Sequence, residues 1–170
     1  MYLTRKLIFF QEDFLKMTKN DNNQSPSVQI ISQYIKDLSF EAPNLPHILG
    51  DLKSAPAITV DIDVRVNKTD NPKMFSVDLH IKGTAKRPDD SREIFICELL
   101  YGALVAADVP AEHLEPVLIV QIPHMLFPYA RAIVANITRE AGLPPLQINP
   151  VDFAMLYHKK LKNQENNKAN

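Results

Sequence analysis

The chain has 170 residues, 45% of them hydrophobic, and a formal net charge of −1 at pH 7. This length and composition predict one globular domain, and the near-neutral charge provides no global field to attract nucleic acid or an anionic membrane. The single cysteine, Cys97, excludes an internal disulfide and favours a reducing compartment, while no apolar run approaches the ~20 residues of a membrane-spanning helix.

The first 27 residues are expected to form a disordered extension. Two basic residues and the short apolar run LIFF come first, but acidic residues follow at once, so a secretory signal peptide is not expected. Met17 opens the polar stretch MTKNDNNQSPS and is interpreted as the natural start, with residues 1–16 as an upstream extension. The predicted organisation is therefore a tail at 1–27, a domain at 28–162 and a disordered polar tail at 163–170.

Period-two alternation predicts a long first strand from Val28 to about Glu41. Asp37 and Glu41 are expected to point the same way, ~13 Å apart at ~3.3 Å per residue. We expect one mostly polar face and one apolar face. The polar set is Gln29, Gln33, Asp37, Ser39 and Glu41, and the apolar set is Val28, Ile30, Tyr34, Leu38 and Phe40.

Residues 42–56 form a long connection with three prolines, which hold the backbone extended and limit its pairing with a sheet. Four apolar residues lie inside this connection: Leu45, Ile48, Leu49 and Leu52. A long apolar connection is either packed down or part of a binding surface.

Clean alternation predicts two further strands in residues 58–66 and 75–82. A fourth strand starts near Ile94 and has two apolar faces, with Glu98 among the apolar residues of its second face. Four strands followed by helices predict an α+β fold, with a four-stranded antiparallel sheet and C-terminal helices packed on one face. The second apolar face of the fourth strand then needs another cover, and a neighbouring subunit is the economical choice.

The C-terminal third predicts two helices separated by a sharp break. Pro128 suits the first turn of a helix, and the apolar stripe that follows ends at Gly142, a left-handed C-terminal cap. That stripe consists of Ala130, Ile133, Val134, Ile137 and Ala141. Upstream, Pro116 and Pro123 are expected to interrupt any long helix.

Asn149 and Pro150 predict the N-cap and the first residue of the second helix. Val151 and Met155 lie on a different side of this helix from its main apolar stripe. The main stripe consists of Phe153, Leu156, Tyr157 and Leu161. A helix with two apolar faces is either sandwiched in a core or offers one face to something else, and the pattern leaves both readings open.

No catalytic or metal-binding motif stands out in the sequence. The five histidines form no H-x-x-x-H or H-E-x-x-H pair, and C-x-x-C, phosphate-loop and serine-elbow motifs are absent, so zinc, nucleotide and serine-hydrolase chemistry are not expected. Cys97 lies mid-strand in apolar company and is interpreted as an inert core thiol. An enzyme that uses Cys97 with a histidine stays open as an alternative.

Two groups of carboxylates deserve comparison as candidate sites. Asp61 and Asp63 alternate with apolar residues on a regular strand, which is typical of a solvated face. Asp37, Glu41 and Glu98 are either a second solvated face or, because Glu98 has apolar neighbours, a recognition surface for a basic partner.

Four segments carry a resemblance to a known family. They are YIKDLSFEAPNLPH at 34–47, IFICELLYG at 94–102, MLFPYARAIV at 125–134 and LQINPVDFAMLY at 146–157. In these segments, and in their order and spacing, the chain resembles the SecB family of export chaperones from about Val28 to Leu161. It differs from some family members in having no Trp in the connection before the second strand.

The resemblance implies a sheet with helices on one face, assembled as a dimer of dimers, which is a homotetramer. It also implies a cytoplasmic, ATP-independent holdase that has no cofactor, metal or enzymatic activity. Such a chaperone binds unfolded preproteins and delivers them to the SecA motor, with no role for nucleic acid or for direct insertion into a membrane. A SecB-like chaperone dedicated to one partner, such as a toxin–antitoxin pair, is the alternative.

Two sets of residues carry over from the family to this sequence. The resemblance assigns an acidic face that docks SecA, whose C-terminal tail is a small, basic, zinc-bound module, to Asp37, Glu41, Ile96 and Glu98. It assigns a client-binding surface to Leu45, Ile48, Leu49, Leu52, Ile58, Val60, Ile62, Phe153, Leu156, Tyr157 and Leu161.

Overall fold

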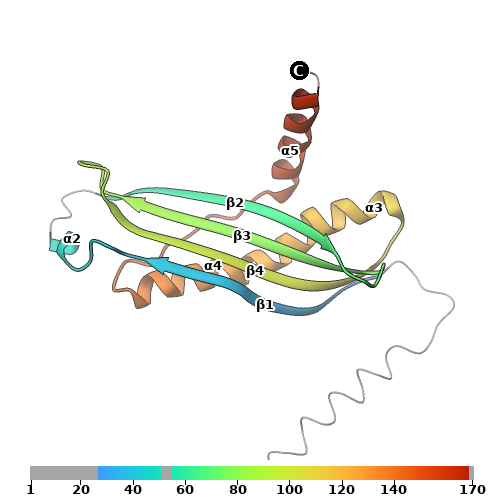
Figure 1. The fold of residues 1–170 in the computed structure, drawn as a ribbon, viewed down its shortest axis with the longest axis horizontal. Helices are drawn as coiled ribbons and strands as arrows, with labels where there is room; N and C mark the ends of the chain where they lie inside the picture. The colour runs from blue at the N-terminus through green and yellow to red at the C-terminus, as the bar shows by residue number, and fades with distance from the viewer. Residues whose placement is uncertain (1–26, 51–54, 169–170) are drawn as a thin grey trace, which may run out of the picture.

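The computed structural model describes residues 27–50 and 55–168, which form an antiparallel sheet backed by helices (Figure 1). The strands are β1 (Ser27–Glu41), β2 (Ala57–Lys68), β3 (Met74–Lys86) and β4 (Glu93–Asp108). The helical elements are α2 (His47–Gly50), α3 (Ala111–Pro116), the π-helical η1 (Val117–Gln121), α4 (Ile122–Glu140) and α5 (Phe153–Lys168). The strand order is β1-β4-β3-β2, so the predicted α+β class and four-stranded antiparallel sheet are confirmed.

The two faces of the sheet have different surroundings. α4 runs across one face, which we call the covered face, and we call the opposite side the open face (Figure 1). Leu126, Ala130 and Val134 of α4 are fully buried. The covered face of β3 and β4 contributes a continuous buried layer: Phe75, Val77, Leu79, Ile81, Ala85, Phe95, Cys97, Leu99, Tyr101, Ala103 and Val105. Burial of this apolar surface, worth ~25 cal/mol per Å², holds the helix on the sheet.

β1 departs from regular alternation, because its pairing with β4 skips Ile31 and Lys36. Each skip is a β-bulge, which adds one residue to the strand and shifts the residues that follow to the other face. Tyr34 therefore lies on the open face, whereas Leu38 and Phe40 lie on the covered face. The predicted common face for these three side chains is wrong, since single-residue bulges break the period of two.

The same bulges divide the predicted polar set of β1. Gln33 lies on the covered face, where its side-chain oxygen accepts a 3.3 Å hydrogen bond from the Tyr101 hydroxyl. Asp37, Ser39 and Glu41 follow the second bulge and lie together on the open face. The prediction that these three share one face is confirmed, but Gln33 does not belong with them.

α3, η1 and α4 form one continuous helix of 30 residues, Ala111–Glu140. The prediction that Pro116 and Pro123 interrupt a long helix is wrong, and so is the predicted helix start at Pro128, which lies inside α4. A π-helical turn follows the first of these prolines, and in it the Ile122 N–H bonds to the carbonyl five residues earlier. Such turns insert a residue without ending the helix, and burial on the sheet offsets the hydrogen bonds that proline removes.

By length and composition this helix could cross a membrane, which corrects the expectation that no apolar stretch approaches that length. Much of its apolar surface, however, lies against the sheet. The buried residues of η1 and α4 are Val117, Leu118, Ile122, Pro123, Leu126, Phe127, Ala130, Val134 and Thr138. This is the burial pattern of a core helix in a globular domain.

The end of α4 follows the sequence prediction. Ala130 and Val134 are buried, and Ile133, Ile137 and Ala141 are half-buried, so the predicted stripe faces the core. Gly142 has a φ of +79°, and its N–H bonds to the Arg139 carbonyl at 2.9 Å. The predicted left-handed cap at Gly142 is confirmed.

The segment after α4 returns along the covered face and packs on the sheet. Its Leu146 N–H donates a 2.9 Å hydrogen bond to the buried Thr138 hydroxyl, which itself donates to the carbonyl of Val134 or Ala135. Leu146 also packs against Gly83 so closely that a Cβ there would lie 2.8 Å from the leucine Cδ2. Thr138 and the absent side chain at Gly83 therefore fix the path that leads into α5.

α5 begins later and ends later than predicted. The side chain of Asp152 caps it by accepting the Met155 N–H at 2.9 Å, so Asn149 is not the N-cap. The helix continues to Lys168, so residues 163–168, which were predicted to belong to a disordered tail, are helical. The predicted tail at 1–26, the proposed start at Met17, and residues 169–170 lie outside the described residues.

Thr138→Val tests the hydrogen bond that holds this return segment. The substitution keeps the volume but leaves the buried Leu146 N–H without its acceptor. We expect the free energy of unfolding to fall by about 1–3 kcal/mol, measured by urea denaturation at one protein concentration. Thr138→Ser keeps the hydroxyl and should lose less stability. Thr59→Val makes the valine substitution at an exposed threonine and should have little effect. An unchanged midpoint for Thr138→Val would contradict this assignment.

Candidate functional site

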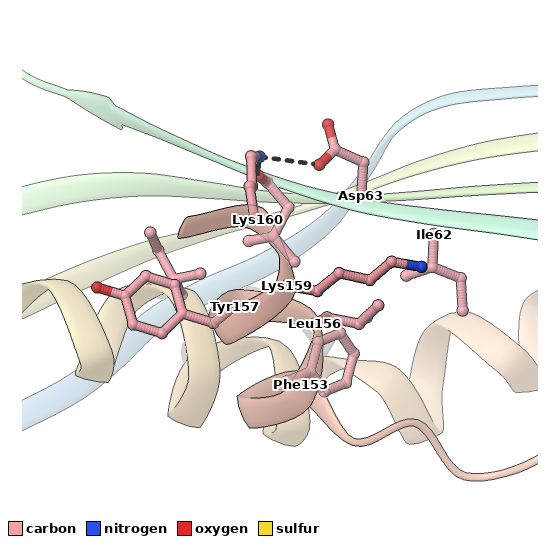
Figure 2. Close-up of a pocket in the computed structure, with 9 residues that line it drawn as sticks. Ile62, Asp63, Phe153, Leu156, Tyr157, Lys159 and Lys160 are labelled. Carbon is pink, nitrogen blue, oxygen red and sulfur yellow. Dashed lines mark hydrogen bonds and ion pairs between the residues drawn. The ribbon is translucent and has the colours of Figure 1, made fainter. Parts of the chain in front are cut away.

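An apolar cavity of about 300 Å³ opens where β2, η1 and α5 meet. Figure 2 shows side chains of β2 and α5 converging on it. Its lining consists of Ile62, Asp63, Val64, Ile119, Phe153, Leu156, Tyr157, Lys159 and Lys160. The covered face of β2 supplies one wall and the first two turns of α5 supply another, so the cavity depends on α5 lying beside the edge strand.

Phe153 anchors α5 at the base of this cavity. It is only 2% exposed, and its ring makes an edge contact with Phe127 of α4 at 5.8 Å between ring centroids. Leu156 remains 38% exposed and Tyr157 is half-buried, so both present apolar surface to the opening. A fixed aromatic base with partly exposed walls can accept an apolar side chain from another molecule without unfolding the core.

Charged groups line one rim of the cavity. The Lys160 ammonium lies 3.1 Å from the Asp63 carboxylate, which joins α5 to β2 (Figure 2). Although partial burial raises the pKa of Asp63, the hydrogen bond and charge of Lys160 lower it overall. Lys159 extends alongside Ile62 (Figure 2). The cavity therefore combines an apolar interior with charges confined to its edge.

The client-binding residues predicted on β2 and α5 gather around this cavity. Ile62, Phe153, Leu156 and Tyr157 line it directly. The covered face of β2 continues beyond the cavity through half-buried Val60 to Ile58, which is 50% exposed. Leu161 is half-buried on α5 and does not line the cavity.

The connection after β1 matches its prediction less well. Leu45 is half-buried, but Ile48 is only 2% exposed and belongs to the core. The Asn44 side chain donates a 2.8 Å hydrogen bond to the Glu93 carbonyl, which holds this connection against the start of β4. Ile48 is therefore a packing residue in this structure, which corrects its assignment to the client surface. The Leu49 side chain and the whole of Leu52 lie outside the described residues.

Sequence reasoning missed five residues of the cavity: the apolar Val64 and Ile119, and the charged Asp63, Lys159 and Lys160 at its rim. Val64 follows the same alternation as Ile62 and could have been found from it. Ile119 lies in η1, and the expectation of an interrupted helix around Pro116 removed the periodicity that would have placed it.

A second group of predicted residues comes together on the open face. Asp37 pairs with Leu100, and Glu41 pairs with Ile96, while Glu98 lies between them opposite Ser39. Both β1 carboxylates are exposed, and Ile96 and Glu98 are half-buried. The four residues predicted to form an acidic face, Asp37, Glu41, Ile96 and Glu98, are therefore neighbours across the β1–β4 pairing.

Glu98 has two partners close by on β3, a histidine and a lysine. His80 Nε2 lies 2.7 Å from one of its oxygens, and Lys82 Nζ lies 3.6 Å from the other. The hydrogen bond to His80 lowers the pKa of Glu98, and the charge of Lys82 adds to the effect. These two partners could not be predicted, because strand periodicity places His80 and Lys82 on a face but does not fix the register between β3 and β4.

Other chemistry finds little support in the described part of the chain. Burial raises the pKa of the Cys97 thiol to about 11, so at neutral pH it is protonated and a poor nucleophile. Among residues 27–50 and 55–168, no group of three or more His, Cys, Asp or Glu side chains is arranged to hold a metal ion.

Known proteins resemble this chain over most of its length. A family model described as preprotein translocase subunit SecB matches residues 21–164. The relative named protein-export protein SecB from Mesorhizobium japonicum is 40% identical over 137 residues, which cover 80% of each chain. The protein of the same name from Bartonella quintana is 34% identical over 154 residues, covering 90% of this chain and 96% of the relative.

A solved structure shows the same fold. A SecB-like chaperone from Mycobacterium tuberculosis, in complex with a peptide from an antitoxin, superposes with a TM-score of 0.60 at 16% identity. The match covers 73% of this chain and 90% of that chain. Together with the family model and the curated relatives, it shows that the chain belongs to the SecB family.

Proposed function

We propose that this SecB chaperone for protein export acts as an ATP-independent holdase, which keeps preproteins unfolded in the cytoplasm and delivers them to SecA. The observation that carries the proposal is the apolar cavity between β2 and α5, continued along β2 by Val60 and Ile58. Unfolded chains expose apolar side chains in no fixed order. Apolar burial is non-directional, so such a surface binds many sequences.

The proposal includes no enzymatic step, nucleotide or metal. A holdase needs only reversible binding, and apolar contacts worth ~25 cal/mol per Å² supply it. The protonated state of Cys97, whose pKa burial raises to about 11, supports an inert thiol rather than a nucleophile. The alternative of a chaperone dedicated to one partner has no specific support, since the antitoxin peptide belongs to a structure that shares only the fold with this chain.

A homotetramer, built as a dimer of dimers, is part of the proposal. The outer side of α4 exposes Met125 (58%), Tyr129 (57%) and Ala132, which follow one another at helical spacing. Large apolar side chains grouped in this way support an interface between copies of the chain. Several client cavities on one assembly would then bind one unfolded chain by avidity.

Tyr129→Glu tests the assembly. A charge placed inside an interface must be desolvated, so the oligomer should dissociate towards smaller species in sedimentation velocity at micromolar concentration. Met155→Glu places the same charge on an equally exposed apolar residue of α5 and should leave the mass unchanged. A monomeric wild-type protein at that concentration would contradict the proposed tetramer.

Leu156→Ala with Tyr157→Ala tests the client cavity. Both side chains present apolar surface to its opening, and truncating them should weaken the binding of an unfolded preprotein about tenfold or more. Binding is measured by fluorescence titration, with the melting temperature as a check on the fold. Met155→Ala removes a comparable exposed side chain outside the lining and should bind normally. If the double variant and Met155→Ala lost client affinity equally, the cavity would not be the binding surface.

We further propose that the acidic face of Asp37, Glu41, Ile96 and Glu98 docks the basic, zinc-bound C-terminal segment of SecA. Changing the three carboxylates to their amides keeps their shape but removes their charge. We expect affinity for this segment to fall more than about tenfold, with a weaker salt dependence, while client binding changes little.

A control for this triple variant has the same change in net charge. Asp61→Asn, Asp70→Asn and Glu112→Gln remove three exposed carboxylates elsewhere in the chain. Isothermal titration of both triple variants, with the SecA segment and separately with a preprotein, distinguishes a local site from the overall charge. If the two triple variants lose SecA affinity equally, the acidic face is only a solvated surface.

A further inference from the structure

The acidic face exists because β1 contains a bulge at Lys36. Ile35 pairs with Tyr101, but the next paired residue is Asp37, opposite Leu100. Continuing the pairing of Ile35 without a bulge would place Asp37 opposite Leu99, on the covered face. A slip of one residue moves every following side chain to the other face, so Glu41 would also leave the open face. The register after Lys36 therefore decides whether these carboxylates meet Ile96 and Glu98.

An ion pair holds the bulged residue across the sheet. The Lys36 ammonium lies 2.7 Å from the carboxylate of Asp78 on β3, on the far side of β4. The Asp78 side chain is 4% exposed, and the side chains of Asn67 and Ser76 also approach it, at 3.4 and 3.3 Å. A carboxylate enclosed in this way is strongly destabilising without its cation, so the pair favours the backbone arrangement that lets Lys36 reach it.

Gly102 leaves room beside this ion pair for the Tyr34 ring and the Asp78 carboxylate. It lies on β4 opposite both Tyr34 and Asp78. A Cβ at Gly102 would lie 2.8 Å from the Tyr34 ring and 3.2 Å from the Asp78 carboxylate. The missing side chain therefore allows the tyrosine ring to pack down over β4, beside the carboxylate.

We propose that Lys36 and Asp78, paired beside Gly102, are positioning residues that select the bulged register of β1 and so place Asp37 and Glu41 beside Ile96 and Glu98. This inference rests on the proposed SecA-docking role of that face. Neither Lys36 nor Asp78 is required to touch SecA. Their effect on docking acts through the position of the two β1 carboxylates.

Another interaction favours the same register and is the competing explanation. Phe40 stacks on Phe95 of the covered face at 5.6 Å between ring centroids, and Leu38 is half-buried nearby. If this apolar packing alone fixed the register, the ion pair would be dispensable. Lys36→Met separates the two explanations, because they predict opposite outcomes for docking.

Lys36→Met removes a positive charge next to Asp37. Electrostatics alone would therefore strengthen docking to a basic partner, whereas loss of the register weakens it. We expect affinity for the zinc-loaded C-terminal segment of SecA to fall about fivefold or more, the lower end of typical coupling between sites. Lys36→Arg keeps the ion pair and should retain affinity. Unchanged or stronger docking by folded Lys36→Met would overturn the proposal.

Two controls exclude simpler causes. Lys73→Met breaks the pair with Asp108, whose atoms lie 2.6 Å apart away from the bulge, and should not weaken docking. The double variant Lys36→Met with Asp78→Leu leaves no unpaired buried charge. If it restored full affinity, the loss in Lys36→Met would come from the orphaned carboxylate and the proposal would be wrong; continued weak binding supports it.

The register of β1 can also be measured directly, without a docking experiment. Ser39 and Glu98 face each other in the wild-type pairing, and NMR contacts between their backbone protons should weaken in Lys36→Met. Persistence of these contacts at wild-type strength would refute the positioning role. Should Lys36→Met not fold, Gly102→Ala replaces it, because the added Cβ would crowd both the Tyr34 ring and the Asp78 carboxylate. We expect the same loss of docking and of NMR contacts, and the same result would refute the proposal.

The triple amide variant of the acidic face keeps this test independent of the docking proposal. If that variant binds the SecA segment normally, the docking proposal fails. The positioning role is then tested by the NMR contacts alone. If it loses binding while folded Lys36→Met does not, docking stands and the positioning role is refuted. Client binding should remain normal in every variant, since the cavity lies at the opposite edge of the sheet.

Discussion

Burial of the covered face beneath the helix of residues 111–140 is the contact on which the rest of the structure depends. It commits β3 and β4 to a dry core on one side and leaves polar and charged side chains, such as those of His80, Lys82 and Glu98, on the other. It also decides what the helix exposes, since the side away from the sheet keeps its apolar surface. The apolar cavity arises at the margin of this contact, where η1 passes β2 and α5 closes the gap.

How far the sequence predicts this structure depends on the range of the interactions involved. The alternation of β2, the stripe of α4 and the cap at Gly142 are local, and the structure confirms them. The bulges at Ile31 and Lys36 were not predicted, because they depend on contacts with distant strands. The prolines of the long helix led to the wrong prediction of a broken helix, because tertiary burial overrides local propensity.

The candidate sites show the same division. The family resemblance assigned Ile62 and Tyr157 to one client-binding surface, and the structure brings them together around the cavity. Ile48 was placed on the client surface although it packs in the core, because a sequence pattern cannot tell a buried connection from an exposed one. The neighbours of Glu98 on β3 were missed, since register between strands is a property of the assembled sheet.

The two surfaces lie at opposite edges and on opposite faces of the sheet. The cavity uses the covered face of β2, whereas Asp37 and Glu41 project from the open face of β1. The strand order places β1 and β2 at the two edges, with β3 and β4 between them. Binding at one surface therefore leaves the other sterically accessible, which suits a chaperone that must hold its client while it meets the next component.

The attachment of α5 has a consequence for the breadth of clients. Phe153 fixes the first turn of the helix in the core, whereas two turns later the contact with β2 is the exposed pair of Lys160 and Asp63. Separating an exposed ion pair costs at most about 1 kcal/mol, which is little more than thermal energy. We therefore expect small displacements of the later turns of α5 from β2 to cost little free energy, so that the mouth of the cavity accepts side chains of different bulk. In the proposed holdase, tolerance for many sequences would then come from an adjustable width as well as from apolar chemistry.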